Sequence, residues 1–300
     1  MKVLCINKRL FSKEVIDLLK KKFYLDFANN CNNINKYDIL LIRPDSYLVG
    51  KISKKTKIKY IISVSTGLNH IDLNIIKKYN IKLFYLKNKY FLNSVKATSE
   101  HTIFLLLSAL RKIKRLFKNP DFQSKHVSNE ISRSKIGILG YGRVGKQVSQ
   151  ILNTFGADLY AYDVKKKALP KYIYECHSMQ ELFKRSKIIL IHIPLNPLTH
   201  EIINKKNLKL LSNKIIINTS RAEVFEENIL IEMIRSNKIT YFTDVVHGEG
   251  SAFNLNKLAK LKTCDNLFIT PHIAGITEES IKITDLYLIN KFIDAISQKK

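Results

Sequence analysis

The chain lacks tryptophan altogether and is sparing with the residues that build disulfides, metal sites and membrane spans. Its 300 residues include only 4 cysteines, which stand alone without a CxxC pair or the Cys/His spacing of a metal site. That pattern is typical of reduced thiols in a cytoplasm and not of a disulfide framework. The most apolar run, 103–110, is far too short to cross a bilayer, and the first residues hold no signal-peptide core. We therefore expect a cytoplasmic protein without a membrane span or a metal.

Acidic residues are scarce as well. The 25 Asp and Glu stand against 51 Lys and Arg, which gives a net charge of +26. Such a charge suggests nucleic acid or a membrane surface as a partner. The excess is mostly lysine scattered along the chain, with no arginine-rich arm or aromatic RNA-binding signature. We interpret it as a solvated surface and expect no specific nucleic-acid partner, while a salt-sensitive attraction to DNA stays an alternative.

Apolar runs alternate with helical patterns along most of the chain. Strands are predicted at 2–6, 23–27, 39–42, 60–64, 81–85, 136–139, 157–162, 188–193, 214–218, 240–245 and 267–270. Helices are predicted at 12–22, 73–78, 97–117, 226–236 and 278–296. The alternation predicts an α/β fold with parallel sheets that carry helices on their faces. Residues 119–134 are polar and are interpreted as a linker or arm.

The stretch 135–163 organises the rest of the chain. A strand leads into Gly140-Tyr-Gly142-Arg-Val-Gly145, a helical pattern and a second strand that ends on Asp163. In a dinucleotide site the first glycine permits a tight turn, the second lets the backbone approach a pyrophosphate, and the third lets the helix lie close to the strand. The helix N-terminus presents N–H groups to the phosphates. A glycine turn alone can be purely structural, but the coincidence of all these parts favours a Rossmann site.

Asp163 bears on which dinucleotide binds. Its carboxylate is placed to accept hydrogen bonds from the adenosine ribose and would repel a 2′-phosphate, which favours NAD over NADP. Lys165, Lys166 and Lys167 follow directly, and lysines there can attract such a phosphate. We predict NAD, with NADP left open.

Later strand ends carry Arg221, Glu249 and His272. The carboxyl ends of parallel strands meet at one edge of a sheet, so these side chains are expected near one another. Arg can hold a carboxylate with two hydrogen bonds, and His can exchange a hydroxyl proton. Alone, an arginine after a strand is more often part of a surface ion pair than a ligand. Only as a set do the three residues predict hydride transfer on a carboxylate-bearing alcohol. His192, at another strand end, is interpreted as part of a cofactor wall or as structural.

Five motifs follow one another in a characteristic order. They are GILGYGRVG at 137–145, IHIPLNPLTHEIIN at 191–204, NTSRAEVFEE at 218–227, TDVVHGE at 243–249 and TPHIAG at 270–275. With them the chain resembles the D-isomer-specific 2-hydroxyacid dehydrogenase family over essentially its full length. The helix KATSEHTIFLLLSALR at 96–111 is most similar to that of phosphoglycerate-dehydrogenase-like members.

The resemblance implies two doubly wound parallel-sheet domains. A flavodoxin-like substrate domain, 1–98 plus 276–300, would surround a Rossmann NAD-binding domain, 99–275, in a homodimer. Arg221 would bind the substrate carboxylate and carbonyl oxygen, His272 would be the acid/base, and Glu249 would pair with it.

The same resemblance and the glycine turn together give the expected binding residues. The predicted cofactor contacts are Gly140, Gly142, Arg143, Val144, Gly145, Asp163, His192, Pro194, Thr199, Thr219, Ser220, Arg221, Asp244 and His272. The predicted substrate contacts are Arg43, Thr66, Gly67, Leu68, Arg221 and His272.

The chain departs from the family pattern at three positions. Ala222 stands where glycine usually follows the arginine, Gly250 where proline usually follows the glutamate, and Pro44 where a small polar residue usually follows Arg43. The last departure puts in doubt a phosphate-binding role for Arg43. The tryptophan-containing arm of the family is unrecognisable, and no regulatory domain that would give serine feedback is expected.

The expected reaction is the NAD-dependent interconversion of a D-2-hydroxy acid and its 2-oxo acid. 3-Phosphoglycerate, hydroxypyruvate, glyoxylate and a branched 2-oxo acid all fit the same catalytic set, so the substrate stays open. An alternative of another class is a NAD-sensing, corepressor-like protein that binds partners without turning over a substrate.

Overall fold

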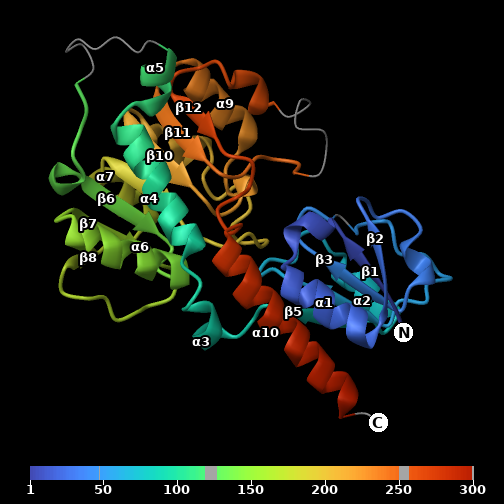
Figure 1. The fold of residues 1–300 in the computed structure, drawn as a ribbon. Coiled ribbons are helices and arrows are strands. Elements are labelled where there is room, and N and C mark those ends of the chain that lie inside the picture. Colours follow the sequence, from blue (N-terminus) through green and yellow to red (C-terminus); the bar gives the residue numbers. More distant parts are fainter. Residues whose placement is uncertain (47, 119–126, 250–256, 299–300) are drawn as a thin grey trace. The chain divides into compact units, whose positions relative to one another are not determined.

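A computed structural model describes residues 1–46, 48–118, 127–249 and 257–298 (Figure 1). The chain divides into two compact units, Met1–Val95 with Ile276–Lys300, and Lys96–Gly275. The strands of each unit pair in parallel within one sheet, which confirms the predicted α/β class with two parallel sheets. Residues 119–126 of the predicted arm at 119–134, and Gly250, fall outside the described residues.

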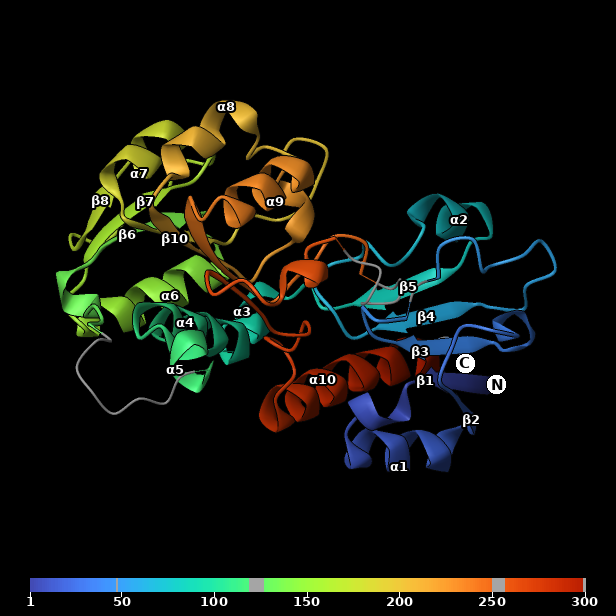
Figure 2. The ribbon, with the colours of Figure 1, turned by 90° about the horizontal axis from the view of Figure 1, so that it is seen from above.

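The first unit is a five-stranded sheet in the order β2-β1-β3-β4-β5 (Figure 2). Its strands are β1 (Lys2–Ile6), β2 (Tyr24–Ala28), β3 (Ile39–Ile42), β4 (Tyr60–Ser63) and β5 (Lys82–Tyr85). Its helices are α1 (Lys13–Lys22), α2 (Leu73–Lys78), α3 (Lys89–Leu92) and α10 (Glu278–Ser297). This order has its switch point between β1 and β3, as in flavodoxin-like sheets.

Both faces of this sheet are covered because its strands are apolar on both sides. Val3 and Cys5 of β1 pack in one cluster with residues of α1 and α10, while Leu4 and Ile6 pack in another with residues of α2. Phe292 of α10 is fully buried among aromatic side chains of β4 and β5. The last helix of the chain is therefore part of the core of the first unit.

The second unit is a seven-stranded sheet in the order β12-β11-β10-β9-β6-β7-β8. Its strands are β6 (Lys135–Leu139), β7 (Asp158–Tyr162), β8 (Ile173–Glu175), β9 (Ile188–Ile191), β10 (Lys214–Asn218), β11 (Ile239–Thr243) and β12 (Leu267–Ile269). Its helices are α4 (Ala97–Leu110), α5 (Ile113–Lys118), α6 (Arg143–Thr154), α7 (Met179–Arg185), α8 (Lys205–Leu208) and α9 (Glu227–Arg235). Chain order reverses at β6, so the switch point lies between β6 and β9, where ligands of such sheets bind.

The prediction of one helix over 97–117 is wrong. Helix α4 ends at Leu110 and α5 begins at Ile113, and Lys112 between them has a left-handed backbone with φ of 52°. A single left-handed residue breaks the run of helical hydrogen bonds, yet the apolar pattern continues on both sides of it. Within the described ranges, no helix combines the length and apolarity that a membrane span needs.

Candidate active site

The three glycines of the turn after β6 each have a different environment. Gly140 has a φ of 95°, and a Cβ added to it would lie 2.7 Å from the carbonyl oxygen of His192. A Cβ on Gly145 would lie 2.3 Å from the carbonyl oxygen of Gly140. Gly142, which caps α6, has no described atom within 4 Å of such a Cβ. The first and third glycines thus hold α6 close to the sheet, and the second leaves open space at the helix N-terminus, which fits a pyrophosphate.

The open space at Gly142 predicts a variant that loses cofactor affinity without losing stability. Gly142 has a φ of −82°, which alanine adopts freely, so Gly142→Ala should keep the melting temperature of the wild type. Its methyl group would occupy the phosphate space and weaken NADH binding about tenfold, the equivalent of about 1.4 kcal/mol. Fluorescence titration with NADH beside a thermal melt checks this. The matched Gly145→Ala should lower the melting temperature; unchanged NADH affinity in Gly142→Ala would contradict the assignment.

Asp163 follows β7 and faces the same turn. Its Oδ2 accepts the backbone N–H of Tyr141 at 2.8 Å, and its Oδ1 accepts the N–H of Lys165 at 2.9 Å. Lys167 forms an ion pair with this carboxylate and also donates to the carbonyl oxygen of Tyr141 at 2.9 Å. Burial alone would raise the pKa of Asp163, but these hydrogen bonds lower it below its ordinary value. Of the three lysines considered from the sequence, Lys167 is the one that balances the charge of Asp163.

His192 lies at the carboxyl end of β9, against the glycine turn. Its backbone N–H donates to the carbonyl oxygen of Leu139 at 2.8 Å, which joins β9 to β6 at the switch point. Burial of its ring lowers its pKa to about 3. The imidazole is therefore neutral at physiological pH and does not supply a cation to the site.

The desolvated ring of His192, whose Nε2 is buried, makes the stability of the chain depend on pH. In the unfolded chain a histidine takes up a proton near pH 6.5, whereas in the folded chain His192 does so only near pH 3. Between these values the unfolded state binds more protons, so stability falls as pH falls, by about 1.4 kcal/mol per pH unit for this group. We expect His192→Asn to lose less stability than the wild type between pH 7.5 and pH 5 in urea unfolding. The same replacement at the exposed His200 is the matched control. An equal dependence of stability on pH in His192→Asn and the wild type would disprove the effect.

The other cofactor residues predicted from the sequence lie in the segments that follow three strands of the same sheet. In the loop after β9, Thr199 Oγ1 donates to the carbonyl oxygen of Pro194 at 2.6 Å. In the loop after β10, Ser220 donates to Asn218 Oδ1 through its N–H and its hydroxyl. Thr219 Oγ1 lies 2.9 Å from Thr102 Oγ1 of α4. Arg143 and Val144 form the first turn of α6, and burial lowers the pKa of Arg143.

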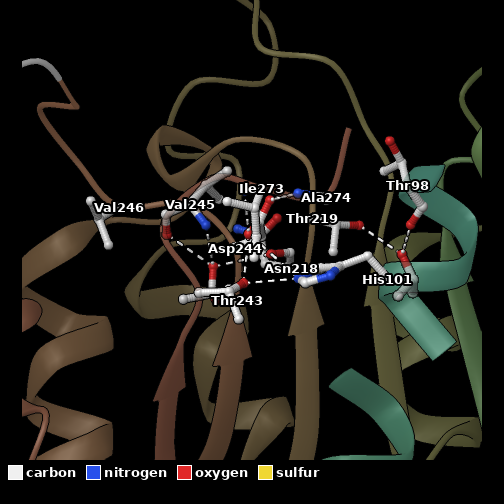
Figure 3. Close-up of polar contacts among 12 residues, drawn as sticks. Thr98, His101, Asn218, Thr219, Thr243, Asp244, Val245, Val246, Ile273 and Ala274 are labelled. Carbon is white, nitrogen blue, oxygen red and sulfur yellow. Dashed lines mark hydrogen bonds and ion pairs between the residues drawn. The ribbon is translucent and has the colours of Figure 1, made fainter. Parts of the chain in front are cut away.

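Asp244 directly follows β11 and is a buried residue with several hydrogen-bond partners at this edge (Figure 3). Its carboxylate accepts the hydroxyl of Thr270 at 2.5 Å and the backbone N–H groups of Ile273 at 2.9 Å and Ala274 at 2.7 Å. Burial alone would raise the pKa of Asp244, but the hydrogen bond from His101 and these other bonds lower it. The carboxylate is thus largely occupied by bonds to the chain itself, a feature that the sequence did not reveal.

His272 and Glu249 form the pair that the sequence predicted. The two residues lie after β12 and β11, and His272 Nδ1 is 2.5 Å from Glu249 Oε2. The N–H of Val246 donates to the other carboxylate oxygen at 3.0 Å, which fixes the glutamate. The His272 side chain is 33% exposed, and its Nε2 has no hydrogen-bond partner within the described residues. The imidazole thus has one nitrogen held by a carboxylate and one available for proton exchange.

Arg221 follows β10, two strands away from β12 in the sheet. Its Nη1 donates to the carbonyl oxygen of Ser220 at 2.6 Å, and within the described ranges it forms no ion pair with an acidic side chain. The carbonyl oxygen of Asn218 accepts the N–H of Asp244 at 3.0 Å. The strand end that leads to Arg221 is therefore hydrogen-bonded to Asp244, which also binds the turn that carries His272. In the same ranges, no three His, Cys, Asp or Glu residues are grouped as a metal site would need.

The residues predicted to bind substrate from the first unit have partners of their own. Ser65 Oγ donates to the carbonyl oxygen of Gly67 at 2.8 Å, which folds the loop that carries Thr66 and Leu68. Arg43 is 7% exposed and forms an ion pair with the fully buried Asp285 of α10. Because Asp285 already balances its charge, Arg43 is better explained as a structural residue than as a phosphate ligand. Contact of these residues with a substrate remains a prediction.

A glycine turn at a switch point, an acid after the next strand and a histidine–glutamate pair at the same sheet edge are the parts that a nicotinamide-dependent dehydrogenase needs. A sequence model described as "D-isomer specific 2-hydroxyacid dehydrogenase, NAD binding domain" matches residues 102–274, more than half of the chain. The chain belongs to this family of NAD-dependent enzymes. The predicted family, enzyme class and cofactor are thereby confirmed.

Known relatives of this chain act on different acids. An aromatic 2-oxoacid reductase of Clostridium sporogenes is 31% identical over 79% of this chain and 76% of its own length. A D-3-phosphoglycerate dehydrogenase of Haemophilus influenzae is 28% identical over 76% of this chain, which spans only 56% of that protein. The crystal structure of D-lactate dehydrogenase from Aquifex aeolicus, complexed with NAD and lactic acid, has a TM-score of 0.82 at 25% identity, covering 100% of this chain and 96% of that one.

Proposed function

We propose that the chain interconverts an unphosphorylated D-2-hydroxy acid and its 2-oxo acid, with His272 as the acid/base. The observation that carries the proposal is the bond between His272 Nδ1 and Glu249 Oε2, at 2.5 Å. A carboxylate at one ring nitrogen orients the imidazole and occupies Nδ1, so the other nitrogen, Nε2, is the one that exchanges a proton with substrate.

The chain's own residues divide the remaining tasks. Arg221, which lacks an acidic partner among the described residues, would hold the substrate carboxylate with two parallel hydrogen bonds. The open space at Gly142 and the N-terminus of α6 would hold the pyrophosphate, and Asp163 the ribose. When bound, the nicotinamide supplies the hydride acceptor for oxidation and the donor for reduction. His272 Nε2 would take the hydroxyl proton in oxidation and return it in reduction.

The preference for an unphosphorylated acid rests on Arg43. The family resemblance suggested this residue for a substrate phosphate, but its guanidinium is buried and paired with Asp285. A phosphate there would have to compete with a carboxylate that is itself fully buried, and separating a buried ion pair is strongly unfavourable. Phosphohydroxypyruvate is therefore the second candidate.

The test is NADH oxidation followed at 340 nm with a panel of 2-oxo acids. Hydroxypyruvate, glyoxylate, pyruvate and phenylpyruvate represent unphosphorylated acids, and phosphohydroxypyruvate represents the second candidate. A clear preference in kcat/KM for phosphohydroxypyruvate would overturn the substrate class and keep the reaction. No turnover of any acid, with NADH still bound, would favour the corepressor-like alternative. Repeating the best reaction with NADPH tests whether Lys167, by balancing Asp163, admits the 2′-phosphate.

A further inference from the structure

Two consecutive residues of α4 reach two different loops of the candidate site. His101 Nε2 lies 2.9 Å from Thr270 Oγ1, in the turn that carries His272. Thr102 Oγ1 lies 2.9 Å from Thr219 Oγ1, in the loop that carries Arg221. Figure 3 shows the His101 side chain extending from α4 toward the end of the sheet where Asp244 lies. We propose that His101 and Thr102 are positioning residues that set the placement of His272 and Arg221.

The hydrogen-bond directions in the His101 chain are fixed by chemistry. The Asp244 carboxylate can only accept, so the Thr270 hydroxyl donates its proton to Asp244 at 2.5 Å. The same hydroxyl must then accept from His101, so His101 Nε2 carries a proton. His101 Nε2 also lies 3.5 Å from Asp244 Oδ1. His101 therefore supports both members of the Thr270–Asp244 pair from outside the loop.

Asp244 also holds the backbone that follows His272. It accepts the N–H groups of Ile273 and Ala274, the two residues that follow His272. His272 itself has a φ of 54°, a left-handed conformation that costs a non-glycine residue free energy and needs support from its surroundings. Hydrogen bonds thus hold the turn at Thr270 before His272 and at two positions after it.

Thr102 acts on the other loop by the same logic. Its hydroxyl donates to the carbonyl oxygen of Thr98 at 2.8 Å, so its oxygen accepts the proton of the Thr219 hydroxyl. Thr219 lies two residues before Arg221, and Thr102 is fully buried. Because His101 and Thr102 are neighbours on one helix, α4 fixes both loops to a single rigid element.

The proposal depends on the proposed function, because it assigns positioning roles for that reaction. A displacement of a catalytic group by about 1 Å can cost about a hundredfold in rate. We expect His101→Leu to lower kcat with the oxo acid by about tenfold to a hundredfold, with the KM for NADH within about threefold of the wild type. His101→Gln keeps an N–H donor on a side chain of similar reach and should restore kcat to within about fivefold of the wild type.

Three matched variants complete the experiment. Thr102→Val removes the hydroxyl and keeps the shape, so kcat should fall while the melting temperature stays close to that of the wild type, and Thr102→Ser should restore kcat. Glu100→Gln changes an exposed neighbour on the same helix and should match the wild type. Wild-type kcat in His101→Leu, or an equal loss in His101→Gln, would overturn the role of His101. Wild-type kcat in Thr102→Val would overturn that of Thr102.

A readout without turnover separates this proposal from the proposed function. The proton between His272 Nδ1 and Glu249 should give a downfield proton resonance at low pH, identified by its loss in Glu249→Gln. His101→Leu should shift or broaden that resonance, and Glu100→Gln should leave it unchanged. An unaltered resonance in His101→Leu overturns the positioning of His272 even if the enzyme is active. An inactive wild type with an altered resonance in His101→Leu overturns the reaction and supports the positioning.

Discussion

Replacing His272 with asparagine is expected to lower the turnover of any 2-oxo acid by about a hundredfold or more while NADH still binds. The imidazole is held by Glu249 at one nitrogen, and its other nitrogen is the acid/base of the proposed reaction. General acid/base groups contribute about 10²- to 10⁴-fold to enzymatic rates, and an amide cannot exchange a proton at neutral pH. The measurement is steady-state NADH oxidation beside NADH fluorescence titration.

Asparagine is chosen because of the backbone at His272. The φ of 54° is tolerated by asparagine better than by alanine, so His272→Asn removes the chemistry with the smallest change in the turn. His272→Ala serves as the comparison and should show the same loss of rate with a lower melting temperature. Substantial turnover by His272→Asn would contradict the acid/base assignment, whereas loss of NADH binding would point to a contact with the cofactor instead.

Much of the second sheet was predictable because its signals are local. The glycine turn, its two strands and Asp163 lie within one continuous stretch, and each has a requirement that few residue types meet. Gly145 illustrates this, since an added Cβ would lie 2.3 Å from a carbonyl oxygen. The histidine–glutamate pair could be predicted because β11 and β12 are neighbours, so their carboxyl ends meet.

The interactions that were missed join residues far apart in the chain. His101 and Thr270 are separated by 169 positions, and nothing in the helical pattern of α4 distinguishes His101 from a surface histidine. The same holds for Asp285, which looks like one polar position on the last helix but is fully buried against Arg43. Hydrophobic periodicity reports which face of an element is buried, not which polar partner it meets there.

The pairing of Asp285 with Arg43 predicts the largest effect on stability. Asp285 also accepts the backbone N–H of Ser12 at 2.8 Å, at the start of α1, so one carboxylate joins β3, α1 and α10. Asp285→Ala would leave a buried guanidinium without a counter-charge, which costs about 3–5 kcal/mol. Urea unfolding at pH 7.5 measures this loss, with Asp294→Ala on the same helix as the control. A loss below about 1 kcal/mol would show that the pair contributes little.

Removing the arginine instead should give a pH-dependent result. Burial raises the pKa of Asp285 to about 6 even though Arg43 lowers it, so in Arg43→Met the carboxyl should take up a proton still more readily. The ordinary pKa of Asp is near 3.9, so the folded state then binds more protons than the unfolded state above that value. Stability of Arg43→Met should therefore rise as pH falls from 7.5 to 5, while Asp285→Ala gains nothing from this group.

The double variant Arg43→Met, Asp285→Leu tests the pair as a unit. It leaves neither a buried charge nor an unpaired carboxyl, so it should be more stable at pH 7.5 than Asp285→Ala. It should also keep its turnover of unphosphorylated 2-oxo acids, because Arg43 has no part in binding them under the proposed function. Loss of that turnover in a folded double variant would restore Arg43 as a substrate residue, and would mean that Asp285 positions its guanidinium.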